Sequence, residues 1–177
     1  VIATPTHLHR PMAEAALRAG LHVILEKPMA PTGADARAIA RLAARRKRVL
    51  TLYQTNRLAA DFQQLRHLIA DGRIGRVYHI RRGIFWYVRR NDWQSLRKFG
   101  GGMLNNYGAH YLDQTLNLTG GRIRRLFCQL RRAATLGDAD DTVKIVYETV
   151  DGTLAEVDIA MGAVVRREHD HPVVARP

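Results

Sequence analysis

Lys27 follows a short apolar run, Val23 to Leu25, that is typical of a buried strand. In open parallel sheets, ligands bind beyond the carboxyl ends of the strands. A lysine at such an end can donate to a substrate oxygen and stabilise a developing alkoxide. Pro28 favours extended geometry at Lys27 and permits a cis bond. An exposed lysine in a turn would show the same spacing, so the position alone leaves both roles open.

A second candidate segment runs from Thr4 to His9, after the apolar residues 1–3 and before a predicted helix. Helix N-termini bind anions and cofactor phosphates readily. His7 and His9 have no obvious third partner for a metal ion, so the sequence predicts no metal site.

The third candidate is a polar stripe on a predicted helix, residues 103–118, formed by Asn106, His110, Asp113 and Asn117. A solvated face would usually carry Lys and Glu, so Asn and His favour a lined cleft. His110 has suitable chemistry for a general base near neutral pH; a structural histidine is the alternative. Trp93 and Gln94 could contact a sugar-like substrate, although Trp93 would also suit a core.

Strands and helices are predicted to alternate over residues 1–56, and this arrangement places such side chains at one edge of a sheet. Strands are predicted at 1–4, 23–25 and 49–53, and helices at about 10–19 and 33–46. Strands alternating with helices of this length imply a parallel sheet.

The pattern changes after residue 57. An amphipathic helix over 58–70 precedes a long strand at 76–88, the glycine run Gly100 to Gly102, and the helix at 103–118. Strands with period-two alternation follow at 123–133, 142–149 and 153–161, with a hairpin signal at Asp151-Gly152. We expect an α/β chain: a partial parallel sheet over 1–56, an α+β domain with a mainly antiparallel sheet over 57–165, and a loose tail over 166–177.

Composition excludes several classes. The 177 residues are 46% hydrophobic and 25% charged, which is ordinary for a globular protein. No apolar stretch is long enough to span a membrane. A net charge of +12 is typical of nucleic-acid-binding proteins. However, the arginines are dispersed and no base-reading motif is visible, so the sequence does not favour that class. The single Cys128 excludes an intramolecular disulfide and fits a cytoplasmic location.

These segments together resemble one family. The residues from Val1 to His9, Glu26-Lys27-Pro28, the run from Gly100 to Asp113 and Asp140-Asp141-Thr142 are similar to the glucose–fructose oxidoreductase, inositol dehydrogenase and rhizopine-catabolism (Gfo/Idh/MocA) family. The resemblance covers about residues 1–165. It implies an N-terminal Rossmann domain that binds NAD or NADP and a C-terminal domain whose sheet mediates homo-oligomer contacts.

The resemblance also implies roles for individual residues. Lys27 would be the catalytic lysine, and His110 would transfer the proton with Asn106 orienting it. The cofactor site would be lined by Thr4, Pro5, Thr6, His9, Glu26, Lys27 and Pro28. The substrate site would combine Lys27, Trp93, Gln94, Asn106 and His110.

Two departures from the family pattern matter. The glycine-rich dinucleotide fingerprint does not occur, and roughly 60 residues of fold would precede Val1 at ~30 per strand–helix–strand unit. We therefore expect an N-terminally truncated fragment that binds cofactor poorly. The family often has Asp where this chain has Asn106, which can orient a ring but supplies no charge.

The leading functional prediction is an NAD(P)-dependent oxidoreductase of a sugar, polyol or related cyclic alcohol. One alternative is a glycoside hydrolase of the same fold that uses NAD transiently. A second is a non-catalytic remnant that acts as an interaction module.

Overall fold

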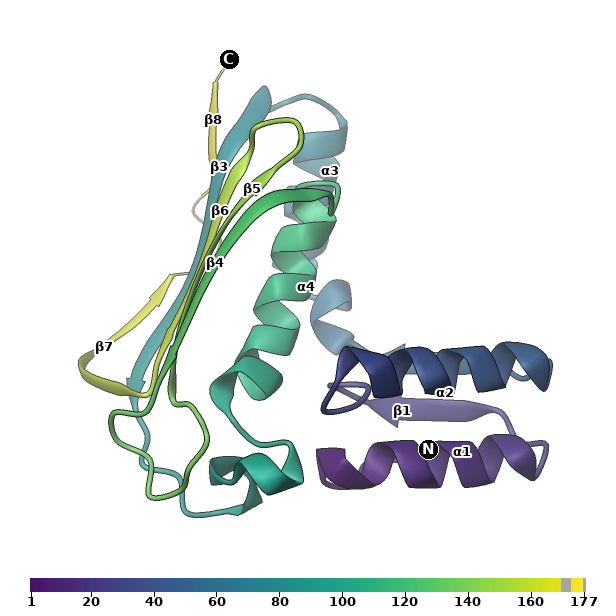
Figure 1. The fold of residues 1–177 in the computed structure, drawn as a ribbon. Coiled ribbons are helices and arrows are strands. Elements are labelled where there is room, and N and C mark those ends of the chain that lie inside the picture. Colours follow the sequence, from purple (N-terminus) through teal and green to yellow (C-terminus); the bar gives the residue numbers. More distant parts are fainter. Residues whose placement is uncertain (170–172, 177) are drawn as a thin grey trace.

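The computed structural model describes residues 1–169 and 173–176. The chain forms two helix–sheet units of different architecture, which are called the N-terminal layer and the second layer (Figure 1). The N-terminal part packs α1 (His9–Arg18) and α2 (Gly33–Arg45) on β1 (Val23–Glu26) and β2 (Leu50–Tyr53). The second part packs α3 (Ala60–Ala70) and α4 (Ala109–Leu118) against a six-stranded sheet.

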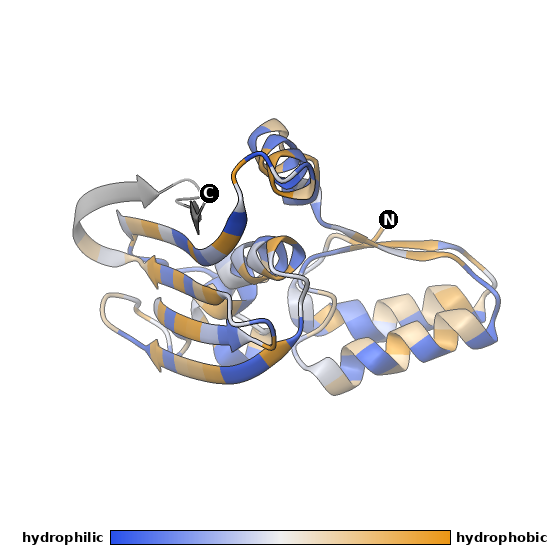
Figure 2. Cartoon of the chain, turned by 90° about the horizontal axis from the view of Figure 1, so that it is seen from above, coloured by the Kyte–Doolittle hydropathy of each residue, from blue (hydrophilic) through white to orange (hydrophobic). Residues whose placement is uncertain are grey.

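The N-terminal sheet is parallel, as its strand–helix alternation predicted. Val23 pairs with Leu50 and Glu26 with Tyr53, so β1 and β2 end at the same edge. Residues 1–4 contribute a single parallel bridge from Ile2 to Leu25 rather than a full strand. Both helices lie on one face of this sheet (Figure 2). Ala13, Leu17, Val23, Leu25, Ile39 and Leu42 form its buried core.

The second sheet has the order β4-β5-β6-β3-β7, and β8 also pairs with β3. Its strands are β3 (Arg76–Tyr87), β4 (Ile123–Arg131), β5 (Thr142–Thr149), β6 (Leu154–Ala160), β7 (Gly162–His169) and β8 (Val173–Arg176). All pairs are antiparallel except β3 with β6. The Asp151-Gly152 hairpin joins β5 to β6 as predicted, because Gly152 adopts the positive φ of 88° that this reversal needs.

The predicted loose tail over 166–177 is wrong for the residues that the structure describes. Both β7 and β8 pair with the long strand β3. The tail lacks period-two alternation, so its sequence predicts no strand. The twelve-residue strand β3, however, has a free edge whose backbone N–H and C=O groups can pair with the tail whatever its side chains are.

The predicted helix over 103–118 also differs in detail. Residues Leu104–Gly108 form a π-helical turn, and the α-helix begins only at Ala109. Asp140 anchors the start of this segment: its backbone oxygen accepts from the Met103 N–H at 2.9 Å and its carboxylate from the Leu104 N–H at 2.9 Å. The wider turn changes which way Asn106 points relative to His110.

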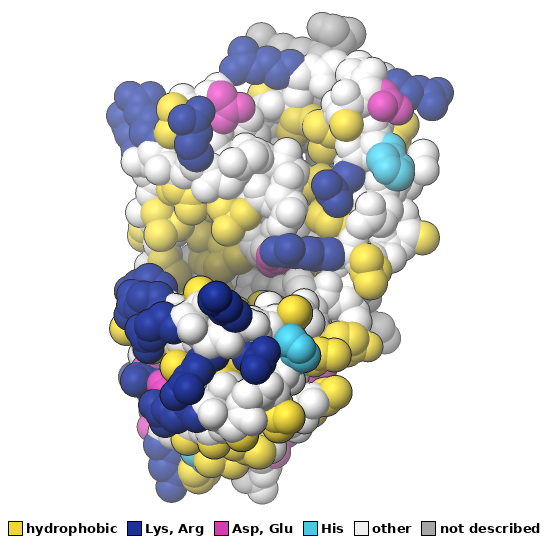
Figure 3. Space-filling model, turned by 90° about the vertical axis from the view of Figure 1, so that its right-hand side faces the viewer, with side chains coloured by type: hydrophobic (Ala, Val, Ile, Leu, Met, Phe, Trp, Pro, Cys, Tyr) yellow, Lys and Arg dark blue, Asp and Glu magenta, His cyan; other side chains and the backbone are white. Residues whose placement is uncertain are grey.

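Within the described part of the chain, no helix is long and apolar enough to cross a membrane. The same residues contain no group of three His, Cys, Asp or Glu side chains that could hold a metal ion. Basic side chains gather on the lower half of the face in Figure 3, over the N-terminal layer, and apolar side chains line a hollow above them.

Asp141 is a buried carboxylate that holds the loop before β5. Its oxygens accept from the backbone N–H groups of Ala133 at 2.8 Å and of Ala134 and Thr135 at 2.6 Å each. Burial alone would raise the pKa of Asp141, but the donors of Ala134, Thr135 and Ala133 together outweigh it and hold the pKa below the usual 3.8.

Asp141→Asn is expected to lower the free energy of unfolding at pH 7 by about 2–3 kcal/mol, because an amide nitrogen cannot accept these bonds. The folded pKa lies below the unfolded one, so the contribution of Asp141 is present above about pH 4 and is lost as the pH falls further. Urea titrations at pH 7 and pH 3 check both points. The exposed Asp71→Asn is the control; equal effects of the two substitutions would contradict this prediction.

Candidate active site

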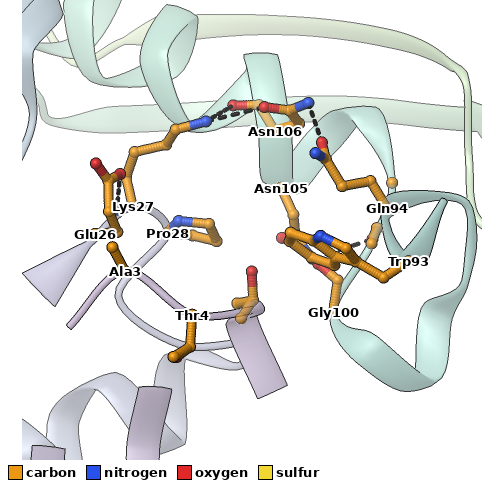
Figure 4. A pocket seen from close by; sticks show the side chains of 13 residues that line it. Ala3, Thr4, Glu26, Lys27, Pro28, Trp93, Gln94, Gly100, Asn105 and Asn106 are labelled. Atoms are coloured by element: carbon orange, nitrogen blue, oxygen red, sulfur yellow. Dashed lines mark hydrogen bonds between the residues drawn. The ribbon is translucent and has the colours of Figure 1, made fainter. Parts of the chain in front are cut away.

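A cavity of about 180 Å³ opens where the two layers meet (Figure 4). The N-terminal layer supplies residues from the carboxyl ends of its parallel strands, and the second layer supplies a loop and the π-helical turn. The lining residues are Ala3, Thr4, Thr6, Glu26, Lys27, Pro28, Trp93, Gln94, Gly100, Gly101, Gly102, Asn105 and Asn106. The site lies beyond the strand ends, where the parallel topology predicts a ligand.

The side chain of Lys27 extends from the N-terminal layer to the second layer. Its ammonium donates to the side-chain oxygen of Asn106 at 2.9 Å and to the backbone oxygen of Asn106 at 3.3 Å. The Lys27–Pro28 bond is cis. Burial lowers the pKa of Lys27; the carboxylate of Glu26 opposes this shift, and the positive charge of Arg90 adds to it. Lys27 is therefore a half-buried cation that faces the cavity and is available to a polar ligand.

Asn106 does not orient His110, which corrects the role that the sequence predicted for it. Its oxygen accepts from Lys27, and its amide donates to the side-chain oxygen of Gln94 at 2.5 Å. Both halves of the amide are therefore used, because the π-helical turn directs Asn106 toward the cavity (Figure 4). Asn106 instead fixes Lys27 and Gln94 relative to each other.

His110 lies on the first turn of α4, next to this network but outside the described lining of the cavity. Its Nδ1 lies 2.5 Å from the side-chain oxygen of Gln54. Burial lowers the pKa of His110 to about 4; Lys27 adds to the shift and Asp113 opposes it. The imidazole is therefore neutral at pH 7, the form that can accept a proton.

The structure separates the residues predicted to bind cofactor into two groups. Thr4, Thr6, Glu26, Lys27 and Pro28 line the cavity, whereas Pro5 and His9 do not. The ring of His9 is buried between two backbone oxygens, at 2.8 Å from that of Pro28 and 2.9 Å from that of Thr4. His9 thus ties the two cavity loops together and has no nitrogen left for a ligand.

The glycine run before the π-helical turn allows close backbone passage, as the sequence predicted. A Cβ at Gly101 would lie 2.4 Å from the backbone oxygen of Gln94, and one at Gly102 would lie 2.3 Å from the Asp140 carboxylate. At Gly100, φ is +74° and a Cβ would approach the Thr6 side chain to 2.9 Å. A larger residue at Gly101 would therefore collide with the backbone of the loop that carries Gln94.

Sequence reasoning missed two residues of the site. Gln54 directly follows β2, so the rule about strand ends that singled out Lys27 could also have found Gln54. Arg90 contributes positive charge near Lys27 and pairs with Asp92 at 2.8 Å. No local pattern marks Arg90 among the many arginines of the chain.

Comparison with curated proteins finds relatives among sugar and polyol dehydrogenases. The chain is 30% identical to scyllo-inositol 2-dehydrogenase (NADP(+)) of Bacillus subtilis, over 68% of this chain and 34% of that protein. It is 31% identical to rhizopine catabolism protein MocA of Rhizobium meliloti, over 86% of this chain and 49% of that protein. The chain spans about a third of the length of the first curated relatives it matches.

Solved structures share the fold. The WlbA dehydrogenase of Chromobacterium violaceum, solved in complex with NADH and UDP-GlcNAcA, superposes with a TM-score of 0.90 at 25% sequence identity. The match covers 98% of this chain and 52% of that one.

Two family profiles cover nearly the whole chain. Residues 1–54 match the oxidoreductase family with an NAD-binding Rossmann fold, and residues 62–174 match the GFO/IDH/MocA C-terminal domain. The chain also has the strand-end lysine, the neutral histidine and the mixed sheet described above. This chain therefore belongs to the GFO/IDH/MocA family of oxidoreductases.

Proposed function

We propose that the protein containing this chain is an NAD(P)-dependent oxidoreductase of a sugar, polyol or related cyclic alcohol. The observation that carries the proposal is the proximity of two groups: Lys27, a half-buried ammonium that lines the cavity, and His110, a neutral imidazole close enough for the charge of Lys27 to lower its pKa. Removing hydrogen from an alcohol needs a base for the hydroxyl proton and a cation for the developing oxygen charge.

Each residue has a definite part in this proposal. Lys27 donates to the substrate oxygen and steadies its negative charge. His110 accepts the hydroxyl proton. Gln94 and Trp93 line the side of the cavity formed by the second layer, where amide and ring surfaces suit the hydroxyls and apolar face of a sugar-like ring.

The cavity suits the reacting end of a nicotinamide cofactor. At about 180 Å³ it is too small for a whole dinucleotide. Thr4, Thr6, Glu26 and Pro28 surround this space on the side of the N-terminal layer, and Lys27 lies beside it. A bound nicotinamide would supply the hydride acceptor, while the residues of this chain orient the alcohol and move its proton.

Self-association through the six-stranded sheet is part of the proposal. α3 and α4 cover one face of the sheet, and no helix covers the opposite face in the described part of the chain (Figure 1). A cytoplasmic location is also proposed, supported by the exposed free thiol of Cys128.

The test is net reduction of NAD⁺ or NADP⁺ by a panel of cyclic polyols and aldoses, with the protein expressed from its full reading frame. We expect reduced nicotinamide to accumulate in proportion to the oxidised sugar. Release of sugar from glycosides with no net reduced cofactor would instead support the NAD-using hydrolase. No turnover in either assay, from a folded protein, would favour the non-catalytic interaction module.

A further inference from the structure

Gln54 joins the end of β2 to the first turn of α4. Its side-chain nitrogen donates to the backbone oxygen of Ala109 at 3.0 Å, and its side-chain oxygen lies 2.5 Å from Nδ1 of His110. The two partners are neighbours in sequence, so one amide spans both. Gln54 itself is 56 positions away from His110.

The carbonyl of Ala109 determines how this amide is oriented. A backbone oxygen only accepts hydrogen bonds, so the NH₂ of Gln54 must face it. The opposite orientation would place two oxygens against each other. The oxygen of Gln54 therefore faces His110, and because an amide oxygen only accepts, Nδ1 of His110 must carry the hydrogen.

We infer that Gln54 is a positioning residue that holds His110 as the Nδ1–H tautomer, so that its Nε2 carries the lone pair that takes the substrate proton. Nε2 has no hydrogen-bond partner among the residues that the structure describes. The inference rests on the proposed function only in assigning the substrate proton to His110. The tautomer itself follows from the contacts of Gln54.

The charged groups around His110 are consistent with a neutral ring. Burial lowers the pKa of His110, and Lys27 lies close enough for its positive charge to lower that pKa further. Asp113, one turn along α4, opposes this shift but is paired with Arg57, whose Nε donates to it at 2.8 Å. The Nδ1 proton is therefore bound by a neutral amide and not by a carboxylate.

Nitrogen NMR of the folded chain tests the tautomer without any turnover. The protein is labelled with ¹⁵N-histidine, and His110 is assigned by the signals lost in His110→Gln. At pH 7 we expect a protonated, pyrrole-like Nδ1 and an unprotonated, pyridine-like Nε2. A protonated Nε2 in the wild-type chain would overturn the inference.

Two substitutions probe the role of Gln54 directly. Gln54→Met keeps the size of the side chain but removes the acceptor, so Nε2 of His110 is expected to gain proton occupancy. Gln54→Glu loses the donor to the Ala109 oxygen but keeps an acceptor for the Nδ1 hydrogen, so it is expected to preserve the tautomer while its charge raises the pKa of His110. The exposed Gln64→Met is the control, and it should leave the His110 signals unchanged. Unchanged signals in Gln54→Met as well would overturn the inference.

Kinetics separate a positioning role from a merely structural one. Gln54→Met should lower kcat by ~10-fold with little change in KM, a part of the 10²–10⁴-fold that a general base supplies. Gln54→Glu should retain more activity and move the acid limb of the pH–rate profile to higher pH. The NMR result does not depend on activity. A correct tautomer in an enzyme insensitive to His110→Ala would therefore remove His110 from the proposed reaction and leave the tautomer standing. An acid limb that Gln54→Glu leaves in place would count against the inference.

Discussion

Replacing His110 with Ala is expected to lower kcat by about 10²–10⁴-fold with a modest change in KM, because the loss removes proton transfer in the transition state. The assay is alcohol-dependent reduction of the nicotinamide cofactor by the protein expressed from its full reading frame. The exposed His67→Ala, on α3, is the matched control and should retain full activity. Retention of wild-type kcat by His110→Ala would remove His110 from the reaction.

The low pKa of His110 adds a pH signature to this prediction. An ordinary histidine protonates near pH 6.5, whereas His110 is held neutral down to about pH 4. The acid limb of the kcat/KM profile of the wild-type enzyme should therefore lie near pH 4. A limb near pH 6.5 would show that the proton acceptor is a more exposed group.

Lys27→Met is expected to lower kcat by about 10²–10³-fold, because the substrate oxygen loses the cation that stabilises its developing charge. Lys27→Arg should restore little of this activity, since the planar guanidinium differs in shape from an ammonium held at 2.9 Å from Asn106. The exposed Lys47→Met provides a control of the same chemistry.

Lys27→Met should also change the behaviour of His110. Lys27 contributes to the lowered pKa of His110, so removing its charge should move the acid limb to higher pH. Burial remains, so the limb should stay below the ordinary histidine value. An acid limb unmoved by Lys27→Met would contradict the electrostatic link between the two residues.

The sequence and the tertiary structure identify different parts of this site. Lys27 was identifiable because it ends a strand flanked by helices, and that pattern is local. His110 was identifiable as a polar residue on a predicted helix. The partner that orients His110 was assigned wrongly to Asn106, because i, i+4 stacking assumes a regular α-helix. The π-helical turn at Leu104–Gly108 breaks that assumption, and its anchor, Asp140, is 36 positions away from Leu104.

By itself, the sequence determined the parallel N-terminal layer, the period-two strands, the Asp151-Gly152 hairpin and the placement of Lys27 at a strand end. These features depend on which side of a helix or strand is apolar, and neighbouring residues report that directly. Only the tertiary structure decided that Lys27 bonds Asn106, that Gln54 holds His110, that His9 braces two loops and that the tail pairs with β3. Such contacts join groups far apart in the sequence: Lys27 and Asn106 are 79 positions apart, and the paired Arg76 and Arg176 are 100 positions apart (176 − 76). They depend on how distant segments pack, which no local periodicity encodes.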